Sequence, residues 1–555
     1  MFNDLRKVKF YEFILLFIYL VLSIALFPIL SYYVDNSDTL QYLTIAQKYV
    51  EGDFYNALNG FWGPLTSWLL VPFLWIGADP IFSFRVLQIT IGMFILHYSF
   101  FFIEKQQINE WLRKGLKMAF VPIILSYVFS TMTADLTMLL FLLVYLKMCV
   151  VDSNNPFVFG VVGALLYFSK SFGLPFFLVH FTAFQFFSFF KKAEFIARKA
   201  VVKKYFFAVF VFSIISGAWI LLLSFKYNKL TISYSATYNL SPEIVTNIKG
   251  KEYHHPFTER GLLLPPSNET AVCAWEDPAS IKVAGFDAFS SKAAFKNYFL
   301  VVKRNFLSIY YNDFKRQIGM ISIVSLFVFF LFIKKPFSKI GFLVGGTLFT
   351  IALFYCGYGL VIIEPRYLWI NNLLLIVVTT YFISEIIRVS KLGKFIGIII
   401  FCLMLFVVIK RPIKQLIFIE DTSVSLEEFS ETIKSPILKL QETYQADKNL
   451  FQLIDTLKKR PDLKGRVASQ KLSKKRNQYA STALISFYLS NPYYGQLSSD
   501  FSTAQNTIQL KEYGIDYYYV WDKNSNSNIL NNTTVLFYDR ATGLEIHSLN
   551  SLDAK

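Results

Sequence analysis

Residues 10–30 read FYEFILLFIYLVLSIALFPIL, an apolar run that contains a single charged side chain. A helix rises 1.5 Å per residue, so about 20 apolar residues cross the roughly 30 Å hydrocarbon core of a bilayer. Basic residues precede the run, as in a signal peptide, but the run is too long for the apolar part of one and lacks a clear small-residue cleavage site. It therefore predicts an uncleaved membrane helix.

The composition of the whole chain supports a membrane protein. Of the 555 residues, 54% are hydrophobic, 60 are Phe and only 17% are charged, against about 25% charged in soluble domains. These values exclude disordered, collagen-like and coiled-coil classes and argue against a soluble multi-domain enzyme. Four cysteines without CxxC or Cys/His spacing predict neither a disulfide framework nor a cysteine-ligated metal.

Ten further apolar stretches follow the first one. Together they predict an all-α polytopic membrane domain over residues 1–410, with about 11 transmembrane helices. The shorter apolar segment 63–78 contains two prolines and predicts a re-entrant or interfacial helix. The ten stretches lie near residues 80–103, 118–131, 134–150, 156–172, 174–190, 205–226, 318–333, 340–358, 367–387 and 395–409.

Basic residues predict the orientation of these spans. With the N-terminus in the cytoplasm, the inner connections hold 20 Lys and Arg residues, whereas the short outer connections hold only Lys48, Lys170 and Arg366. Positive charge gathers in cytoplasmic loops, so this asymmetry favours the topology. Most of the net charge of +17 then marks membrane orientation, which removes the reason to expect nucleic acid binding. The inner connections are 1–9, 104–117, 147–155, 191–204, 334–339 and 388–394.

Three larger segments are then expected on the outer side. The first outer loop covers residues 31–79, and a second long loop covers 227–317. Residues 411–555 alternate helix-like periods with short strands such as RVAS, DYYYVW and TVLFYD, which predicts a small soluble α/β domain. Lys410, Arg411 and Lys414 follow the last span on the side where basic residues are not expected.

The first outer loop carries the clearest chemical signal. Asp35 and Asp38 lie just beyond the first span, and a helical period follows them. A carboxylate at the membrane boundary can act as a general base or help to bind a cation. The simpler alternative is a solvated loop residue or, for Asp38 before TLQYL, a helix N-cap.

Other charged residues fall at the outer ends of spans. Lys170 has apolar sequence on both sides, so it either has a function at membrane depth or extends to the interface. Asp135 opens a span and could be an N-cap. Glu364 and Arg366 could form a simple ion pair beside an aromatic belt, or Arg366 could hold an anionic headgroup. The predicted topology places all of these residues on one outer rim, which indicates an active site there.

The order of these motifs resembles the GT-C superfamily of integral membrane glycosyltransferases, and within it the protein O-mannosyltransferase and aminoarabinose-transferase branch. In the first loop the resemblance rests on Asp38, Tyr42, Ala46, Gly52-Asp53 and the segment from Pro64 to Leu69. Later motifs also fit over roughly residues 1–410. They are Asp135 at the outer end of a span, Tyr167 with Lys170 and Ser171, and Pro365-Arg366-Tyr367.

The resemblance implies transfer of a sugar from a polyprenyl phosphate to an acceptor hydroxyl on a protein, lipid or glycan. It implies Asp38 as the catalytic carboxylate, assisted by Asp35, and Lys170 and Arg366 as partners of the donor phosphate. Tyr42, Asp135, Glu364 and Tyr367 would support substrate binding. It also implies an extracytoplasmic active site, and together with the Lys, Asn, Ile and Phe bias it suggests a bacterial inner membrane.

Two departures limit what the resemblance implies. Thr39 follows Asp38 where many relatives have an acidic residue, and Gly63 stands where aminoarabinose-type members have Lys. Neither aminoarabinose specificity nor a metal site on an Asp-Glu pair therefore carries over, and a divalent cation is left without assigned ligands. The alternatives are a polymerase or ligase that uses a lipid-linked oligosaccharide, and a transporter or flippase, although no internal repeat is visible.

Overall fold

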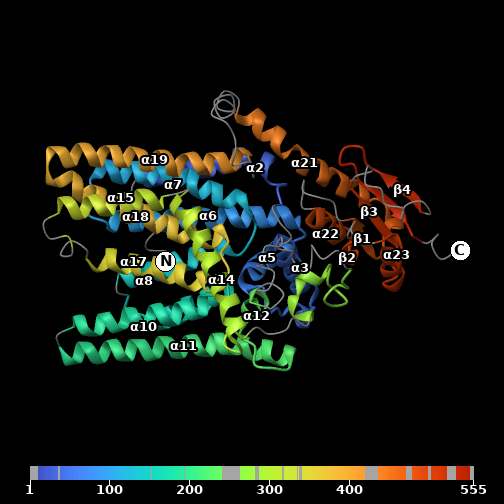
Figure 1. Cartoon of the computed structure of the whole chain (residues 1–555), viewed down its shortest axis with the longest axis horizontal. Coiled ribbons are helices and arrows are strands. Elements are labelled where there is room, and N and C mark those ends of the chain that lie inside the picture. Colours follow the sequence, from blue (N-terminus) through green and yellow to red (C-terminus); the bar gives the residue numbers. More distant parts are fainter. Residues whose placement is uncertain are drawn as a thin grey trace.

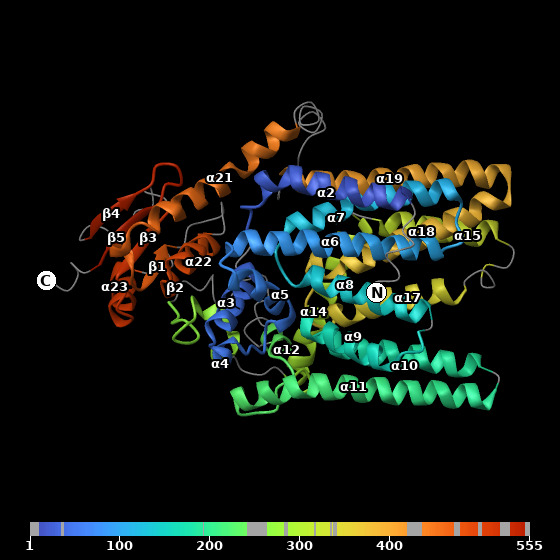
Figure 2. The same cartoon turned by 180° about the vertical axis from the view of Figure 1, so that it is seen from behind.

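The apolar stretches form a bundle of long helices, and a small α/β module lies at one end of it, as the computed structural model shows (Figure 1). The reverse view shows the same arrangement, with the helices of the first loop between the bundle and the module (Figure 2). The structure describes residues 10–34, 38–151, 153–192, 194–240, 263–281, 287–315, 318–333, 336, 341–418, 436–470, 478–497, 502–521 and 533–549.

A helix occupies each of the eleven stretches that the sequence predicted as spans. Their ends differ from the prediction by a few residues in most cases. The helices are α2 (Phe10–Leu30), α6 (Pro80–Lys105), α7 (Glu110–Ser130), α8 (Asp135–Val150), α9 (Pro156–Ser169), α10 (Gly173–Lys191), α11 (Phe195–Tyr227), α15 (Gly319–Phe332), α17 (Phe342–Gly359), α18 (Trp369–Val389) and α19 (Lys391–Phe418).

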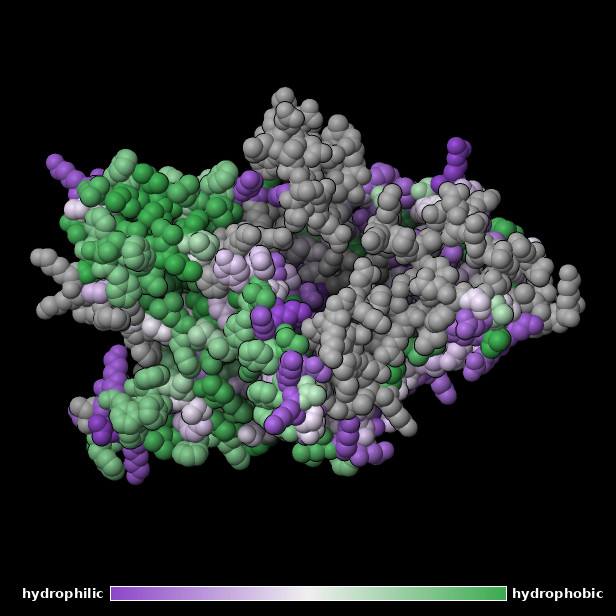
Figure 3. Space-filling view, in the orientation of Figure 1, coloured by the Kyte–Doolittle hydropathy of each residue, from purple (hydrophilic) through white to green (hydrophobic). Residues whose placement is uncertain are grey.

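Length and composition qualify six helices of the described chain as membrane spans. Several others are apolar but too short, so helices at eleven positions do not by themselves establish eleven crossings. Residues spaced one turn apart on α11, including Phe206, Phe210 and Ile214, are exposed, and green hydrophobic residues cover the bundle end of the molecule in Figure 3. Such an apolar surface is typical of contact with lipid, and these features support an integral membrane protein.

The innermost helix of the bundle is α18. Every residue from Trp369 to Ile386 is buried, and a short 3₁₀ turn, η4 (Pro365–Leu368), precedes it. Pro365 opens that turn, where its missing N–H costs no hydrogen bond. Arg366 is therefore placed at the start of the helix that lies deepest in the bundle.

The last helix of the bundle extends beyond the predicted boundary of the membrane domain. The expected span ended at residue 409, but α19 continues to Phe418. Lys and Arg are good helix formers, so the basic residues 410, 411 and 414 end the apolar run without ending the helix. The boundary predicted at 410 consequently falls inside a helix.

The first loop folds into α3 (Asp38–Glu51), α4 (Phe54–Ala57) and α5 (Pro64–Trp75). Gly52 has a φ of 80°, a conformation that glycine adopts readily. Asp53 then caps α4 by accepting a hydrogen bond from the backbone N–H of Asn56. The predicted helix and turn are confirmed, while the interfacial position of α5 stays a prediction.

The second loop contains more regular structure than the sequence analysis predicted. Segment 227–317 was expected as a long polar loop, but it includes the 18-residue helix α14. The apolar side chains of α14 lie on one face of the helix, and polar side chains cover the other face. A search for continuous apolar stretches therefore misses this helix. The elements of this loop are α12 (Ser235–Asn239), η1 (Ala274–Glu276), η2 (Pro278–Ser280), α14 (Lys292–Ile309) and η3 (Tyr310–Lys315).

The C-terminal module (436–549) is a mixed α/β structure, as predicted. Its five described strands form one sheet in the order β2-β1-β3-β5-β4, in which β1 pairs in parallel with β2 and β3, and β5 pairs antiparallel with β3 and β4. Three of the strands were predicted, whereas β2 and β5 were not. The elements are α21 (Pro436–Leu457), η5 (Pro461–Leu463), β1 (Val467–Gln470), α22 (Gln478–Leu489), β2 (Tyr493–Leu497), α23 (Thr503–Glu512), β3 (Tyr517–Val520), β4 (Thr534–Tyr538) and β5 (Glu545–Ser548).

Candidate functional site

A cavity of about 510 Å³ lies where the first loop, the second loop and the ends of several bundle helices meet. This volume is within the range of about 300–1,000 Å³ that is common for small-molecule sites. The lining residues are of three chemical kinds, which we call the charged, aromatic and aliphatic parts of the cavity. The charged residues of the lining are Asp38, Asp135, Lys170, Glu364 and Arg366.

Asp38 is the first residue of α3, and both of its carboxylate oxygens accept hydrogen bonds. Oδ2 accepts a bond of 2.7 Å from Nη2 of Arg366, and Oδ1 accepts one of 3.2 Å from the indole Nε1 of Trp275. The side chain is 16% exposed. The carboxylate is thus held by donors from distant parts of the chain, and the N-cap alternative does not account for these contacts.

Asp135 is the first residue of α8, next to the same guanidinium. Its Oδ1 lies 2.5 Å from Nζ of Lys170, and its Oδ2 lies 3.6 Å from Nε of Arg366. The hydroxyl of Thr133 also donates to Oδ2. Two carboxylates and two cations therefore form one alternating cluster, in which Arg366 lies between Asp38 and Asp135.

Lys170 occupies the turn between α9 and α10, after the last residue of α9. Its ammonium group lies 3.8 Å from the centroid of the Tyr367 ring, a favourable cation–π position. Burial disfavours the charged form and lowers the pKa of Lys170, while Asp135 opposes that shift. The Lys170 side chain is therefore held at the cavity by the Asp135 carboxylate and the Tyr367 ring. It does not extend to the membrane interface, which was the alternative.

The remaining predicted residues complete the charged part of the cavity. Burial raises the pKa of Glu364 above its usual range, and Arg366 only partly offsets this. Tyr367 stacks on Tyr358 with ring centroids 4.8 Å apart. Tyr42 is almost fully buried and packs edge-on against Trp62. The simpler alternative, an ion pair of Glu364 with Arg366, does not form, because Arg366 pairs with Asp38 and Asp135.

The aromatic part of the cavity was not predicted. Phe61, Tyr238 and Trp275 pack against one another with ring centroids 5.2–5.6 Å apart, and Trp62 joins them. Tyr238 and Trp275 belong to the second loop, whose sequence resembles an ordinary polar connection. The only signal was the tryptophan itself, an unusual residue for such a loop, and its partners lie more than 200 positions away.

The aliphatic part of the cavity lies between the turn at Lys170 and the loop before η4. It includes Pro175, Val361 and Ile362, together with the ring of Phe172. Phe172 packs against Tyr358 of α17 with centroids 4.3 Å apart. An apolar chain could contact this part while a charged end reached Lys170 and Arg366.

Gly63, one of the two departures from the family pattern, has a structural reason. A Cβ added to this residue would lie 2.4 Å from the backbone oxygen of Ser169 and 2.5 Å from that of Phe168. Real Cβ atoms do not approach backbone atoms that closely, so only glycine fits without a shift of the chain. Gly63 therefore packs directly against the residue that precedes Lys170, and a lysine at position 63 would displace that turn.

Seven of the eight predicted site residues line this one cavity: Asp38, Tyr42, Asp135, Lys170, Glu364, Arg366 and Tyr367. Asp35 lies outside the described residues. The assigned roles stay predictions. Among the residues that the structure describes, no group of three or more His, Cys, Asp or Glu residues is arranged to hold a metal ion. Asp38 and Asp135 contact cationic side chains, and the divalent cation stays without assigned ligands.

No family model matches the chain, and no curated protein matches its sequence. Solved structures are similar to it. ArnT from Cupriavidus metallidurans bound to undecaprenyl phosphate is 10% identical, with a TM-score of 0.49 over 96% of this chain and 98% of that one. The apo form of the same protein is 9% identical, with a TM-score of 0.48 over 95% and 97%.

A third similar structure is an archaeal oligosaccharyltransferase, AglB from Archaeoglobus fulgidus, in complex with an inhibitory peptide and a dolichol-phosphate. It is 9% identical, with a TM-score of 0.42 over 92% of this chain and 69% of that one. Sequence identities near 10% and TM-scores below 0.5 attach no substrate or reaction to this chain.

Proposed function

We propose that this chain is a membrane glycosyltransferase that moves a sugar from a polyprenyl-phosphate donor to an acceptor hydroxyl. The observation that carries this proposal is the cluster of Asp38, Asp135, Lys170 and Arg366 in a cavity that also has an aliphatic part. A donor of this class combines a phosphate, a sugar and a long apolar chain. The three parts of the cavity match these three chemical groups.

The two cations suit the donor phosphate. A guanidinium has five N–H donors, so Arg366 can hold Asp38 and Asp135 and still donate to a phosphate oxygen. Lys170 adds a compact positive charge at the same place. As the bond between the anomeric carbon and the phosphate oxygen breaks, that oxygen keeps the electron pair. Positive groups placed beforehand at the developing charge stabilise the transition state.

Asp38 suits the role of general base. The acceptor oxygen would attack the anomeric carbon from the side opposite the phosphate, with inversion, while its proton passes to the Asp38 carboxylate. The contacts from Arg366 and Trp275 fix the direction of that carboxylate. The products are the glycosylated acceptor and the polyprenyl phosphate, and no oxidant or cofactor is needed.

The aromatic part of the cavity suits the sugar. Phe61, Tyr238 and Trp275 present ring faces and edges next to hydroxyl groups of the second loop, including Ser233 and Ser235. Aromatic side chains with polar neighbours favour ligands that have both apolar and polar faces. The cavity volume of about 510 Å³ fits a small sugar better than a whole oligosaccharide. The asymmetry of basic residues supports an extracytoplasmic position for this site.

The experiment uses purified full-length protein in detergent with a panel of undecaprenyl-phosphate-linked monosaccharides, and follows release of undecaprenyl phosphate in the presence of candidate acceptors. Release with at least one donor is expected, at a rate that depends on the acceptor. The same protein in liposomes is tested for movement of the donor between leaflets. Movement without release would replace the transferase by a flippase, and release only from oligosaccharide-linked donors would favour the polymerase or ligase.

A further inference from the structure

The segment 263–281 of the second loop lies between the first loop and the C-terminal module, and it carries Trp275 to Asp38. On the module side, the backbone N–H of Tyr493 donates to the carbonyl of Val272 at 2.7 Å, and that of Leu264 donates to the carbonyl of Tyr494 at 2.8 Å. The segment thus makes two backbone hydrogen bonds to β2, a strand at the edge of the sheet. On its other side it packs on α3, the helix that begins with Asp38.

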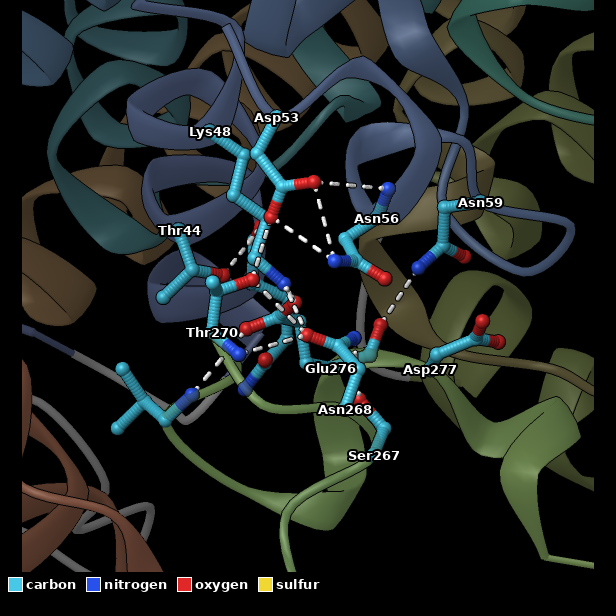
Figure 4. Close-up of polar contacts among 12 residues, drawn as sticks. Thr44, Lys48, Asp53, Asn56, Asn59, Ser267, Asn268, Thr270, Glu276 and Asp277 are labelled. Atoms are coloured by element: carbon cyan, nitrogen blue, oxygen red, sulfur yellow. Dashed lines mark hydrogen bonds and ion pairs between the residues drawn. The ribbon is translucent and has the colours of Figure 1, made fainter. Parts of the chain in front are cut away.

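A buried ion pair joins this segment to α3. Lys48 on α3 contacts the carboxylate of Glu276, and their side chains are only 2% and 1% exposed. Nζ of Lys48 also donates to Oδ1 of Asn268 at 2.9 Å, and Oε2 of Glu276 accepts the backbone N–H of Val272 at 3.3 Å. Figure 4 shows Lys48, Asn268 and Glu276 converging from the first and second loops.

Neighbouring residues tie the backbone beside Trp275 to the first loop. The amide of Asn59 donates to the carbonyl oxygen of Glu276 at 2.6 Å (Figure 4). Its own oxygen accepts the N–H groups of Phe61 and Trp62. The indole of Trp62 donates to the carbonyl of Trp275 at 3.3 Å. The backbone on the C-terminal side of Trp275 Cα is therefore held by the first loop independently of the bond to Asp38.

The free-energy cost of burying the Lys48–Glu276 ion pair indicates that the pair serves to fix the relative position of the two loops. Taking two charges out of water costs several kcal/mol per ion, and their attraction often only balances that cost. Burial raises the pKa of Glu276, and Lys48 acts in the opposite direction to keep the carboxylate charged. An apolar pair of similar volume would hold the two loops together about as strongly. It would not fix the orientation of one loop relative to the other, because apolar contacts are not directional.

We propose that Trp275 is a positioning residue for Asp38, and that the buried Lys48–Glu276 pair and the C-terminal module hold it in place. The inference rests on the proposed role of Asp38 as general base. In this arrangement Arg366 and Trp275 hold one oxygen each, so the carboxylate cannot rotate away from the acceptor. A base displaced by about 1 Å loses much of its effect, which gives the module a function in catalysis without contact with the substrate.

Two variants test the proposal without leaving a buried charge unpaired. Trp275→Phe removes the indole N–H and keeps an aromatic ring in the wall of the cavity. The double variant Lys48→Met with Glu276→Gln removes both charges together, because removing one alone risks unfolding. The matched control is Trp521→Phe, which removes an indole bond to Thr482 inside the C-terminal module.

The first measurement does not require activity. The full-length protein is labelled with 5-fluorotryptophan, and the fluorine resonances are assigned by single Trp→Phe variants. The Trp275 resonance is expected to move in Asp38→Asn and in the Lys48/Glu276 double variant, while the Trp521 resonance stays in place. A Trp275 resonance that is unchanged in both variants would overturn the inference, whether or not the protein transfers sugar.

The second measurement separates binding from turnover. With an undecaprenyl-phosphate sugar that the wild type uses, Trp275→Phe is expected to lower kcat about tenfold, as for a lost hydrogen bond to a charged group, with the Kd for undecaprenyl phosphate unchanged. The double variant should lower kcat as well, and combining it with Trp275→Phe should cost little more, since both act by one route. The inference would be contradicted if the combined variant lost kcat by the product of the two separate factors. It would also be contradicted if Trp275→Phe kept the wild-type kcat. Absence of turnover in the wild type with every donor would instead contradict the proposed function.

Discussion

Arg366 Nη2 donates a hydrogen bond of 2.7 Å to Oδ2 of Asp38, although the two residues are 328 positions apart in the sequence. Arg366 stands at the start of the innermost helix, and Asp38 stands at the start of the helix that follows the first span. The bond therefore connects the rigid centre of the bundle to the loop that carries the proposed base. It also places a permanent positive charge beside both Asp38 and Asp135.

Replacing Arg366 should remove this connection. Arg366→Met is expected to lower kcat/KM for a polyprenyl-phosphate sugar by about 10²–10³, because a preorganised charge at the leaving phosphate is lost. Arg366→Lys should recover only part of the activity, since an ammonium cannot contact two carboxylates in the fixed geometry of a guanidinium. Steady-state kinetics on purified protein measure both effects.

The control for these variants is Arg388→Met. Arg388 pairs with Glu385 on the same helix, near its other end. The kinetic constants of this variant should match those of the wild type. Equal losses in Arg366→Met and Arg388→Met would mean that charge on α18, and not the position of Arg366, is what matters.

Lys170 predicts a pH dependence of donor binding. Burial lowers the pKa of its ammonium group, so the charged form is complete at low pH and is lost as the pH rises through that lowered value. Affinity for undecaprenyl phosphate should therefore fall on the alkaline side, where the phosphate no longer titrates. Lys170→Arg should shift this fall to higher pH, because a guanidinium stays charged. Binding titrations of undecaprenyl phosphate between about pH 7 and pH 11 would show this shift. If the Kd of the wild type and of Lys170→Arg varied with pH in the same way, the charge of Lys170 would have no part in donor binding.

Gly63 predicts a steric effect on the same lysine. Gly63→Ala places a Cβ against the backbone oxygens of residues 168 and 169, so the turn that carries Lys170 must move. We expect weaker binding of undecaprenyl phosphate and a lower Tm. Gly217→Ala is the matched control, because an added Cβ meets nothing within 4 Å in the middle of α11. A wild-type Kd for Gly63→Ala would show that the position of the turn is not important.

At the end of the bundle opposite the cavity, a substitution is expected to lower the stability of the fold without changing the rate of sugar transfer. Lys117 lies between Glu12 and Glu104, almost fully buried. Lys117→Met removes the cation that Glu12 contacts and leaves Glu104 with Arg113, 3.4 Å away, and it should lower the free energy of unfolding by about 3–5 kcal/mol. Activity per folded molecule should be retained. The exposed pair of Lys114 with Glu110 is the control, and Lys114→Met should leave Tm unchanged. Thermal unfolding in detergent compares the two variants.

Local patterns were sufficient to predict where the helices of the bundle lie, but not all of their ends. Apolar length placed Lys170 and Asp135 at helix ends, and loop charge placed them on the same side as Asp38. Such patterns could not predict which charged side chains pair with one another. Glu364 is two positions from Arg366, yet the guanidinium points to Asp38 and Asp135, because the path of the chain before α18 directs it there.

Trp275 shows a second limit of the sequence. It lies in a loop whose polar composition indicates exposure, but it is 5% exposed because Phe61 and Trp62 of the first loop and Tyr238 of its own loop pack against it. No periodicity within the loop reflects that burial. The amphipathic helix α14 in the same loop was missed for a related reason, since its apolar face becomes visible only when the helical period is applied to that segment.

The role of Asp38 as general base is the central claim, and a single-turnover measurement tests it most directly. Wild-type protein and Asp38→Asn are each saturated with the same undecaprenyl-phosphate sugar, acceptor is added, and release of undecaprenyl phosphate is followed. Asp38→Asn should bind the donor within a few-fold of the wild-type Kd and transfer sugar about 10²–10⁴ times more slowly, the usual contribution of a positioned base. Transfer at the wild-type rate by Asp38→Asn, with the donor equally bound, would contradict this role.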